Sequence, residues 1–190
     1  MPKLIAAINS TLDGFCDHTA GIADDELHVH YTELLNNAGT ILYGRKTFEL
    51  MKYWQDVMKN PAGHKAEDDF AIAIDKLPKI VFSHTLKNPG WESARMATKK
   101  LEEEIYELRQ KPGKDIFLGS PGLIAQAVNL NLIDEFQLCI HPVILGKGLP
   151  LFKNISDKKN LELIKTKIFG SGAIVLYYKE MPDDKLIRNL

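Results

Sequence analysis

The sequence has few of the features that mark a secreted, membrane or nucleic-acid-binding protein. Only Cys16 and Cys139 are cysteines among 190 residues, too few for a disulfide framework, so we expect the reducing cytoplasm. The 24 basic and 25 acidic residues leave a net charge of −1, which disfavours nucleic acid as a partner. The longest unbroken apolar run, 173–178, is too short to cross a bilayer. No signal sequence precedes the segment at 3–8, in which Lys3 is followed by five apolar residues, so we do not expect secretion.

Several motifs that would identify a catalytic or binding site are also absent. The sequence has neither the G-x-G-x-x-G of a Rossmann domain nor the G-x-x-x-x-G-K-[ST] of a P-loop. It has no G-x-S-x-G to support a serine nucleophile. The six histidines are scattered, and His28 and His30 cannot share one helix face. Neither cysteine has a C-x-x-C partner, so we expect no metal site.

Short β-branched runs alternate with longer amphipathic segments, a pattern typical of an α/β domain. Gly170-Ser171-Gly172 separates the last two apolar runs and predicts a hairpin there. We therefore predict one domain over residues 1–180, built on a mostly parallel mixed sheet with helices on both faces and a C-terminal antiparallel hairpin, and then a tail at 181–190. The predicted strands are 3–9, 40–43, 79–82, 92–96, 115–118, 135–140, 143–145, 161–169 and 173–179; the predicted helices are 24–37, one beginning near 45, 67–77, 99–110 and 123–130.

Two predicted strand-to-helix turns carry the strongest functional signal. A helix begins with free backbone N–H groups and the positive end of its dipole, so it favours an anion. Small residues let a ligand approach the backbone closely. Two such turns at the carboxyl ends of strands indicate a nucleotide with more than one phosphate group, although each could be only a capped helix start. The first turn holds Gly44, Arg45, Lys46 and Thr47, and the second holds Gly119, Ser120, Pro121 and Gly122, with Leu123 and Ile124 following.

The segment Ser83-His84-Thr85 follows the third predicted strand. Its hydroxyls and imidazole are chemically able to contact a further phosphate. Residues of these types more often simply form a turn. Taken alone, the segment favours the turn.

The first predicted helix brings Asp24 and His28 one turn apart beside its apolar face. A titratable pair in that position is able to donate a proton to a bound ligand. The alternative, which the spacing alone favours, makes Asp24 the N-cap and His28 a packing residue. Phe48, Tyr53 and Trp54 form an aromatic group whose default role is core packing. At a pocket rim, Phe48 and Trp54 would instead suit a flat heterocyclic substrate.

Five stretches of the sequence, taken in order, resemble a known family. Each is weak alone, but together they are fairly specific. The chain resembles the dihydrofolate reductase superfamily, and within it the stand-alone relatives of the reductase domain of the bifunctional riboflavin-biosynthesis deaminase/reductase, RibD. The stretches are LIAA with STLDG at 4–7 and 10–14, GRKTFE at 44–49, VFS at 81–83, GSPG at 119–122, and LIDE at 132–135 with HPVILGKGLPLF at 141–152.

The resemblance implies a three-layer dihydrofolate reductase-like fold that binds NADPH without a Rossmann fingerprint, as a homodimer. It places Ala6 and Ala7 against the nicotinamide carboxamide. It places Asp13 and Gly14 in a loop that closes over that ring. The other implied cofactor contacts are Gly44, Arg45, Lys46 and Thr47 at the phosphates, Ser83, His84 and Thr85 near the adenosine 2′-phosphate, and Gly119, Ser120, Pro121, Gly122, Leu123 and Ile124 at the pyrophosphate.

The chain departs from the family pattern at three places. Ser120-Pro121 stands where the most familiar phosphate turn has adjacent glycines. Counting back from Gly44 without gaps puts His28 near the acid of dihydrofolate reductases, with Asp24 or Asp25 a turn away. The deaminase signature H-x-E…P-C-x-x-C is absent. Two hypotheses follow: an NADPH-dependent reductase of a riboflavin precursor or a pterin, and a non-catalytic nucleotide-binding or regulatory module on the same fold.

Overall fold

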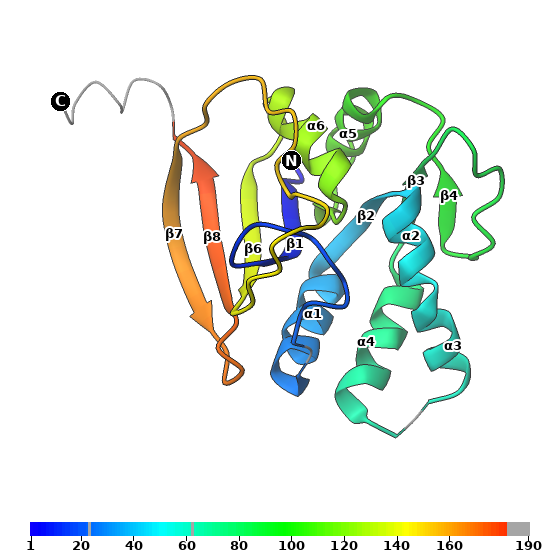
Figure 1. Ribbon diagram of the computed structural model, residues 1–190. Helices are drawn as coiled ribbons and strands as arrows, with labels where there is room; N and C mark the ends of the chain where they lie inside the picture. Colours follow the sequence, from blue (N-terminus) through cyan, green and yellow to red (C-terminus); the bar gives the residue numbers. More distant parts are fainter. Residues whose placement is uncertain (23, 62, 182–190) are drawn as a thin grey trace.

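The computed structural model describes residues 1–22, 24–61 and 63–181, which form an eight-stranded sheet (Figure 1). The strands lie in the order β4-β3-β2-β5-β1-β6-β8-β7. Neighbouring strands from β4 to β6 are parallel, and β8 is antiparallel to both β6 and β7. The predicted mixed sheet with a C-terminal antiparallel hairpin is confirmed. The strands are β1 (Leu4–Thr11), β2 (Ala38–Gly44), β3 (Lys79–Phe82), β4 (Ala94–Met96), β5 (Asp115–Leu118), β6 (Glu135–His141), β7 (Leu161–Ile168) and β8 (Ile174–Glu180).

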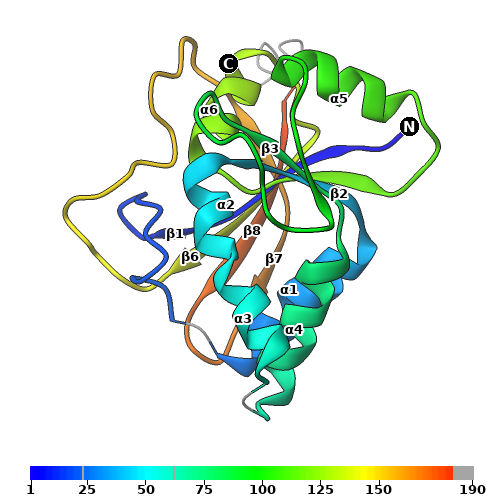
Figure 2. The same cartoon turned by 90° about the vertical axis from the view of Figure 1, so that its right-hand side faces the viewer.

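Helices cover both faces of the sheet, as predicted. Along β1 the side chains alternate, so Leu4 and Ala6 pack in the cluster that contains α5 and α6, while Ile5 packs in the cluster that contains α1, α2 and α4. Figures 1 and 2 show α5 and α6 together, apart from the group of α1, α3 and α4. The helices are α1 (Asp25–Asn37), α2 (Arg45–Met51), α3 (Tyr53–Lys59), α4 (Lys65–Lys76), α5 (Leu101–Arg109) and α6 (Pro121–Asn129).

Several helix boundaries differ from the predictions by one or two residues, and at the start of α6 the reason is local. α6 begins at Pro121 rather than at 123, because proline lacks the N–H that the first helical position would leave unbonded. The helix predicted near 45 is followed by a second one, and α2 and α3 meet at Lys52.

The predicted strand at 143–145 is wrong. These residues form no ladder with the sheet. Their backbone bonds instead to the loop after β1, where the Leu12 N–H donates to the Val143 carbonyl at 2.9 Å. The chain then turns at Gly146, whose φ is +78°, a conformation that glycine adopts without strain. The loop after β1 and the loop after β6 therefore lie side by side (Figure 1).

The parallel strands β1, β2, β3, β5 and β6 all end at one edge of the sheet, so the loops that follow them gather there. In open α/β sheets, ligands bind at this carboxyl edge. Within the part of the chain that the structure describes, no helix is long and apolar enough to span a membrane. Most of the predicted tail, 182–190, lies outside the described residues.

Candidate functional site

The two strand-to-helix turns meet at the carboxyl edge of the sheet. Their strands, β2 and β5, are neighbours. The Gly44 N–H donates to the Ser120 hydroxyl at 2.9 Å, and the Gly119 N–H donates to the Leu42 carbonyl at 3.2 Å. The N-termini of α2 and α6 therefore open next to each other, 76 residues apart in sequence.

Neither helix start has a side-chain cap within the described residues. Gly44 has no side chain to offer α2, and the Ser120 hydroxyl makes no cap bond to α6. A serine at this position commonly caps its own helix. Here its oxygen accepts the Gly44 N–H instead. The alternative of two ordinary side-chain-capped helix starts does not describe these turns.

A cleft of about 480 Å³ lies over the joined turns. Its lining brings together all three predicted phosphate-contacting segments, together with Leu149, which the sequence did not single out. Gly119 and Ile124 lie outside this lining, and Ile124 is buried in the core. The lining residues are Gly44, Arg45, Lys46, Thr47, Ser83, His84, Thr85, Ser120, Pro121, Gly122, Leu123 and Leu149.

The basic side chains of the cleft remain available to an anion. Among the described residues the Arg45 guanidinium pairs only with Glu49, at 3.1 Å on the helix surface, an exposed interaction that contributes little and exchanges easily. Lys46 is exposed at the start of α2. Together with the backbone N–H groups, these cations make the turn suited to a phosphate.

The segment 83–85 forms a turn that also lines the cleft. The Ser83 hydroxyl accepts the N–H groups of Thr85 at 3.1 Å and Leu86 at 2.9 Å, which is the turn that the residue types favour. His84 and Thr85 are exposed. The Ser83 hydroxyl therefore stabilises the turn, while His84 and Thr85 still present polar groups to the cleft.

A second cavity of about 630 Å³ adjoins the cleft and shares Ser83, His84 and Leu123 with it. Its far wall consists of Thr98, Lys99 and Lys100, at the start of α5. These residues were not identified from the sequence as a site. The available signal was a pair of lysines in the first positions of the predicted helix 99–110, directly after a threonine.

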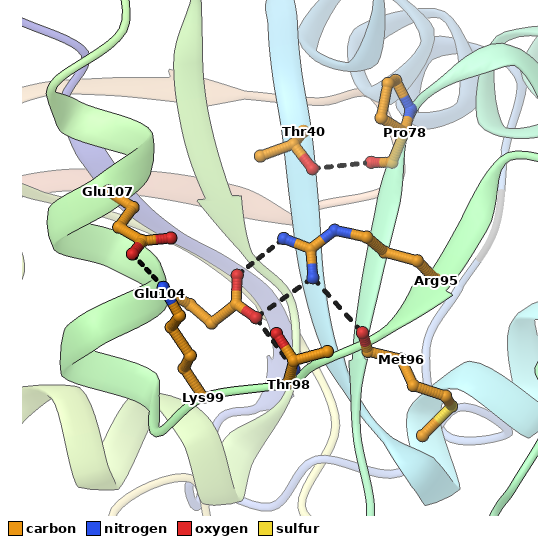
Figure 3. Close-up of polar contacts among 8 residues, drawn as sticks. All are labelled: Thr40, Pro78, Arg95, Met96, Thr98, Lys99, Glu104 and Glu107. Carbon is orange, nitrogen blue, oxygen red and sulfur yellow. Dashed lines mark hydrogen bonds and ion pairs between the residues drawn. The ribbon is translucent and has the colours of Figure 1, made fainter.

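Glu104 on α5 holds this wall in place (Figure 3). Its carboxylate is buried and accepts two bonds from the Arg95 guanidinium, at 3.0 and 2.6 Å. It also accepts the Thr98 N–H at 3.0 Å. The Arg95 guanidinium, opposed by partial burial, keeps the pKa of Glu104 below its ordinary value. Lys99 pairs with Glu107, whereas Lys100 has no ion partner among the residues described.

Asp13 and Gly14 lie in the loop after β1, and this loop is joined to the loop after β6. The Asp13 carboxylate accepts the Thr11 hydroxyl at 2.6 Å and the N–H groups of Leu145 and Gly146, the latter at 2.7 Å. These bonds, that from Thr11 first, lower the pKa of Asp13 to about 2. Gly14 has a φ of +83°, which favours glycine. Asp13 therefore fastens the two loops together.

Asp24 has the geometry of an N-cap. Its carboxylate accepts the Leu27 N–H at 2.7 Å. The Ser171 hydroxyl stands beside this carboxylate, without a well-formed hydrogen bond, and is the main reason that the pKa of Asp24 lies below its ordinary value. Partial burial opposes this shift, and the Leu27 N–H adds to it. Asp24 is therefore ionised near neutral pH and holds no proton to donate.

The other predicted pocket residues lie among aromatic side chains. The His28 ring is half-buried between Trp54 and Phe70, with centroids 5.7 and 5.9 Å away. Phe48 is completely buried, 5.9 Å from the Trp91 ring, which is its default role in the core. Trp54 is half-buried against Phe70. The structure thus groups His28 with Trp54, while the Asp24 carboxylate caps the start of α1.

Ala6 and Ala7 lie in the middle of β1. The Ala6 side chain is completely buried on the α5–α6 face, and Ala7 is half-buried on the α1 face. Two residues further along, Asn9 contacts Tyr31 on α1 and His141 at the end of β6. These three polar residues were not identified from the sequence, because nothing in their spacing predicts their contact.

The comparisons with known proteins agree with this geometry. The RibD C-terminal domain matches residues 2–175. The uncharacterized protein YyaP of Bacillus subtilis is 36% identical over 180 residues, covering 93% of this chain and 94% of YyaP. A pyrimidine reductase-like protein of Corynebacterium diphtheriae has the same fold, with a TM-score of 0.67, 18% identity, and coverage of 96% of this chain and 93% of that one.

A larger solved structure also contains this fold. The diaminohydroxyphosphoribosylaminopyrimidine deaminase/5-amino-6-(5-phosphoribosylamino)uracil reductase of Thermotoga maritima superposes with a TM-score of 0.65 at 18% identity. The match covers 95% of this chain and 57% of that one. The resemblance seen in the sequence is thus confirmed by the domain match and the shared fold. The chain belongs to the RibD C-terminal domain family.

Proposed function

We propose that this protein is an NADPH-dependent reductase that transfers a hydride to a small heterocycle. The candidate substrates are a riboflavin precursor of the 5-amino-6-(5-phosphoribosylamino)uracil type and a pterin of the dihydrofolate type. Membership of the family supports a reductase, and the reductase in the name of the Thermotoga maritima relative favours the first substrate. The riboflavin precursor would be reduced at its aminoribose, and the pterin in its ring.

The observation that carries the proposal is the junction between the two helix starts. The Gly44–Ser120 hydrogen bond holds two sets of backbone N–H groups at one cleft. Arg45, Lys46 and the Thr47 hydroxyl add charge and a further donor. A donor set of this kind fits the doubly anionic pyrophosphate of a dinucleotide.

The remaining residues fit the two ends of the same cofactor. The adjoining cavity is bordered by Ser83, His84 and Lys100, the last without an ion partner in the described part of the chain. There they would hold the adenosine 2′-phosphate that distinguishes NADPH from NADH. Ala6 and Ala7 would meet the nicotinamide end on β1. When bound, the reduced nicotinamide supplies the hydride. The protein's part is to hold the donor and acceptor carbons close together and aligned.

The proton that completes the reduction comes from water in this proposal. Asp24 is an ionised N-cap, and the His28 ring packs between two aromatic rings. Neither has the geometry of a general acid that faces the cleft. Replacing either residue by alanine should therefore affect stability more than the hydride-transfer step.

Binding of NADPH tests the proposal directly. Adding NADPH should quench the tryptophan fluorescence and raise the melting temperature. At a concentration about one hundred times the Kd, binding stabilises the fold by about 2.7 kcal/mol. NADH, which lacks the 2′-phosphate, serves as the matched control and should bind more weakly. A protein that responds to neither nucleotide at saturating concentration would refute the cofactor assignment.

The placement of Asp24 and His28, neither of which faces the cleft as a general acid, also favours a second candidate, a nucleotide-binding module without catalysis. The two candidates differ in one measurement. The reductase should consume NADPH in the presence of 5-amino-6-(5-phosphoribosylamino)uracil or dihydrofolate. The module should bind NADPH and leave it unoxidised with both. The expected homodimer can be measured on the same samples by light scattering.

A further inference from the structure

A chain of hydrogen bonds crosses from β6 to β1 and on to α1 at the carboxyl edge. β1 and β6 run side by side (Figure 1), and Asn9 pairs with Cys139 in their register. The Asn9 Oδ1 lies 2.8 Å from the Tyr31 hydroxyl and 3.1 Å from the Nε2 of His141. On its other side, the Nδ1 of His141 lies 3.1 Å from the Ile22 nitrogen.

The protonation of His141 follows from its partners. A backbone N–H can only donate, so the Nδ1 of His141 accepts from Ile22 and carries no hydrogen. The imidazole is therefore neutral, with its hydrogen on Nε2. His141 is 2% exposed, and burial lowers its pKa although the Asp24 carboxylate raises it. The Nε2–H then donates to the Asn9 Oδ1.

The same bonds fix the orientation of the Asn9 amide. Its Oδ1 accepts from both His141 and Tyr31, whose pKa is raised well above its ordinary value by burial, so that its hydroxyl remains a donor. Flipping the amide would point its N–H groups at the Nε2–H of His141, placing donor against donor. The amide nitrogen of Asn9 therefore faces away from His141 and Tyr31. Within residues 1–22, 24–61 and 63–181 it has no hydrogen-bond partner, and Asn9 is exposed.

The location of this free amide nitrogen suggests what it contacts. Side chains two residues apart share one face of a strand, so Asn9 projects from the same face of β1 as Ala7. Ala7 is the residue assigned above to the nicotinamide end. Asn9 therefore lies beside the place where the reactive ring and the substrate would meet.

We infer that Asn9 is a specificity-determining residue that presents its two N–H groups to a carbonyl oxygen of the bound ligands. This inference rests on the proposed function. The carbonyl belongs either to the nicotinamide carboxamide or to the ring of the substrate. In both cases a ligand with an amino group at that position is disfavoured, because donor would face donor.

A structural role for Asn9 is the competing explanation, since its oxygen satisfies two donors from α1 and β6. Asn9→Asp separates the two roles. One carboxylate oxygen can still accept from Tyr31 and His141, so the internal bonds are kept. The outward group becomes an oxygen, which changes a donor into an acceptor. The melting temperature of the variant shows whether the fold is retained.

The experiment compares the wild-type chain with Asn9→Asp, using three probes. These are NADPH, 5-amino-6-(5-phosphoribosylamino)uracil at saturating NADPH, and 2,4-diaminopyrimidine, which has amino groups in place of the uracil oxygens. If the substrate supplies the carbonyl, the KM for the uracil should rise about tenfold to a hundredfold, while the NADPH Kd changes little. If the carboxamide supplies it, the NADPH Kd should rise instead. In the first case 2,4-diaminopyrimidine should bind the variant more tightly than the wild type.

Three outcomes overturn the inference. One is a variant with unchanged melting temperature and unchanged affinity for all three probes. Another is a variant that melts earlier and weakens every probe alike, which would assign Asn9 to the fold alone. The third is a wild-type chain that binds no NADPH, which refutes the proposed function and the inference that rests on it; this result is obtained before any variant is made.

A second variant guards against misfolding of the first. Tyr31→Phe keeps the ring and removes one of the two bonds that orient the amide. As a positioning residue, Tyr31 should change the ratio of uracil to diaminopyrimidine affinity in the same direction as Asn9→Asp, by a few-fold. If the carboxamide supplies the carbonyl, Tyr31→Phe should raise the NADPH Kd instead. A folded Tyr31→Phe protein in which neither the ratio nor the NADPH Kd changes would count against the inference.

Discussion

The carboxyl edge of the sheet has two halves that use similar residues differently. Over β2, β3 and β5, the turns leave Arg45, Lys46 and backbone N–H groups facing a cleft. Over β1 and β6, the polar groups bond to one another: Asp13 holds the neighbouring loop, and His141 bonds to Asn9. Glycines, histidines and hydroxyls occur in both halves. A residue type therefore indicates a ligand site only where its hydrogen-bonding capacity is not already used within the chain.

Asn9 is the exception that connects the halves. Its oxygen belongs to the internally bonded half, whereas its nitrogen faces outward with no partner among the described residues. The same internal bonds that use up one end of the amide therefore orient the other end. The experiments below test the contrast between used and available groups in each half.

The largest effect on stability should come from adding a side chain at Gly119, in the turn between β5 and α6. A Cβ added to Gly119 would lie 2.8 Å from the Cε1 of Tyr43, a ring that is 4% exposed. Gly119→Ala should therefore destabilise the fold by about 1–3 kcal/mol, because a buried ring has little room to move. Urea unfolding measures this difference.

Gly122 supplies the matched control three residues later. A Cβ added there meets nothing within 4 Å, and Gly122 lies inside α6. Gly122→Ala should leave stability unchanged or raise it by up to about 1 kcal/mol through helix propensity. Equal losses in the two variants would show that the contact with Tyr43 is not what requires glycine.

Arg45 tests whether the cleft half binds the cofactor. Arg45→Ala should weaken NADPH binding by about 1.5–3 kcal/mol, roughly tenfold to a hundredfold, through loss of charge-assisted hydrogen bonds. Glu49→Gln should act in the opposite direction or not at all, because it removes the carboxylate that competes for the guanidinium. Fluorescence titration at two salt concentrations measures both. An Arg45→Ala protein with wild-type affinity would mean that the phosphates lie elsewhere.

The effect of Asp13 should be local and visible only in acid. Because its folded pKa of about 2 lies below the ordinary value of 3.8, its carboxylate stabilises the joined loops above about pH 4. This contribution is lost as the pH falls toward 2. Hydrogen exchange should show the Leu145 and Gly146 amides losing protection over that range.

Asp13→Asn provides the control for the acid effect. Without the charge, the two amides should be weakly protected at every pH. The Ile124 amide, which donates to the Ser120 carbonyl, should be unaffected in both proteins. Protection of Leu145 and Gly146 that follows the same pH profile in the variant would exclude Asp13 as the cause.

Local patterns in the sequence were enough to predict most elements of the fold. The alternation of short β-branched runs and amphipathic segments placed β1, β2, β5 and the C-terminal hairpin within one or two residues. The same reasoning failed at 143–145, where a strand-like run bonds to a loop instead. A short apolar run does not reveal whether its hydrogen-bond partner will be a strand or a loop.

The cleft was predictable only in part, for the same reason. Gly44, Arg45 and Ser120 were identified because helix starts have a local signature. Their junction was implied by the rule that parallel strands end at one edge. Lys100 and the wall held by Glu104 were not identified, because the Arg95–Glu104 pair forms only when β4 packs beside α5.

What the sequence determined by itself were the features that arise between near neighbours: where helices begin, where glycine permits a turn, and which faces are apolar. The tertiary structure decided which polar groups are used within the chain and which remain available. Asn9 and His141 are 132 residues apart. The direction of the Asn9 amide depends on the ring hydrogen of His141, which lies on Nε2 because Ile22, on a third segment, donates to Nδ1. Hydrogen bonds are directional and their partners exclude one another, so their pattern is settled only when distant segments are brought into contact.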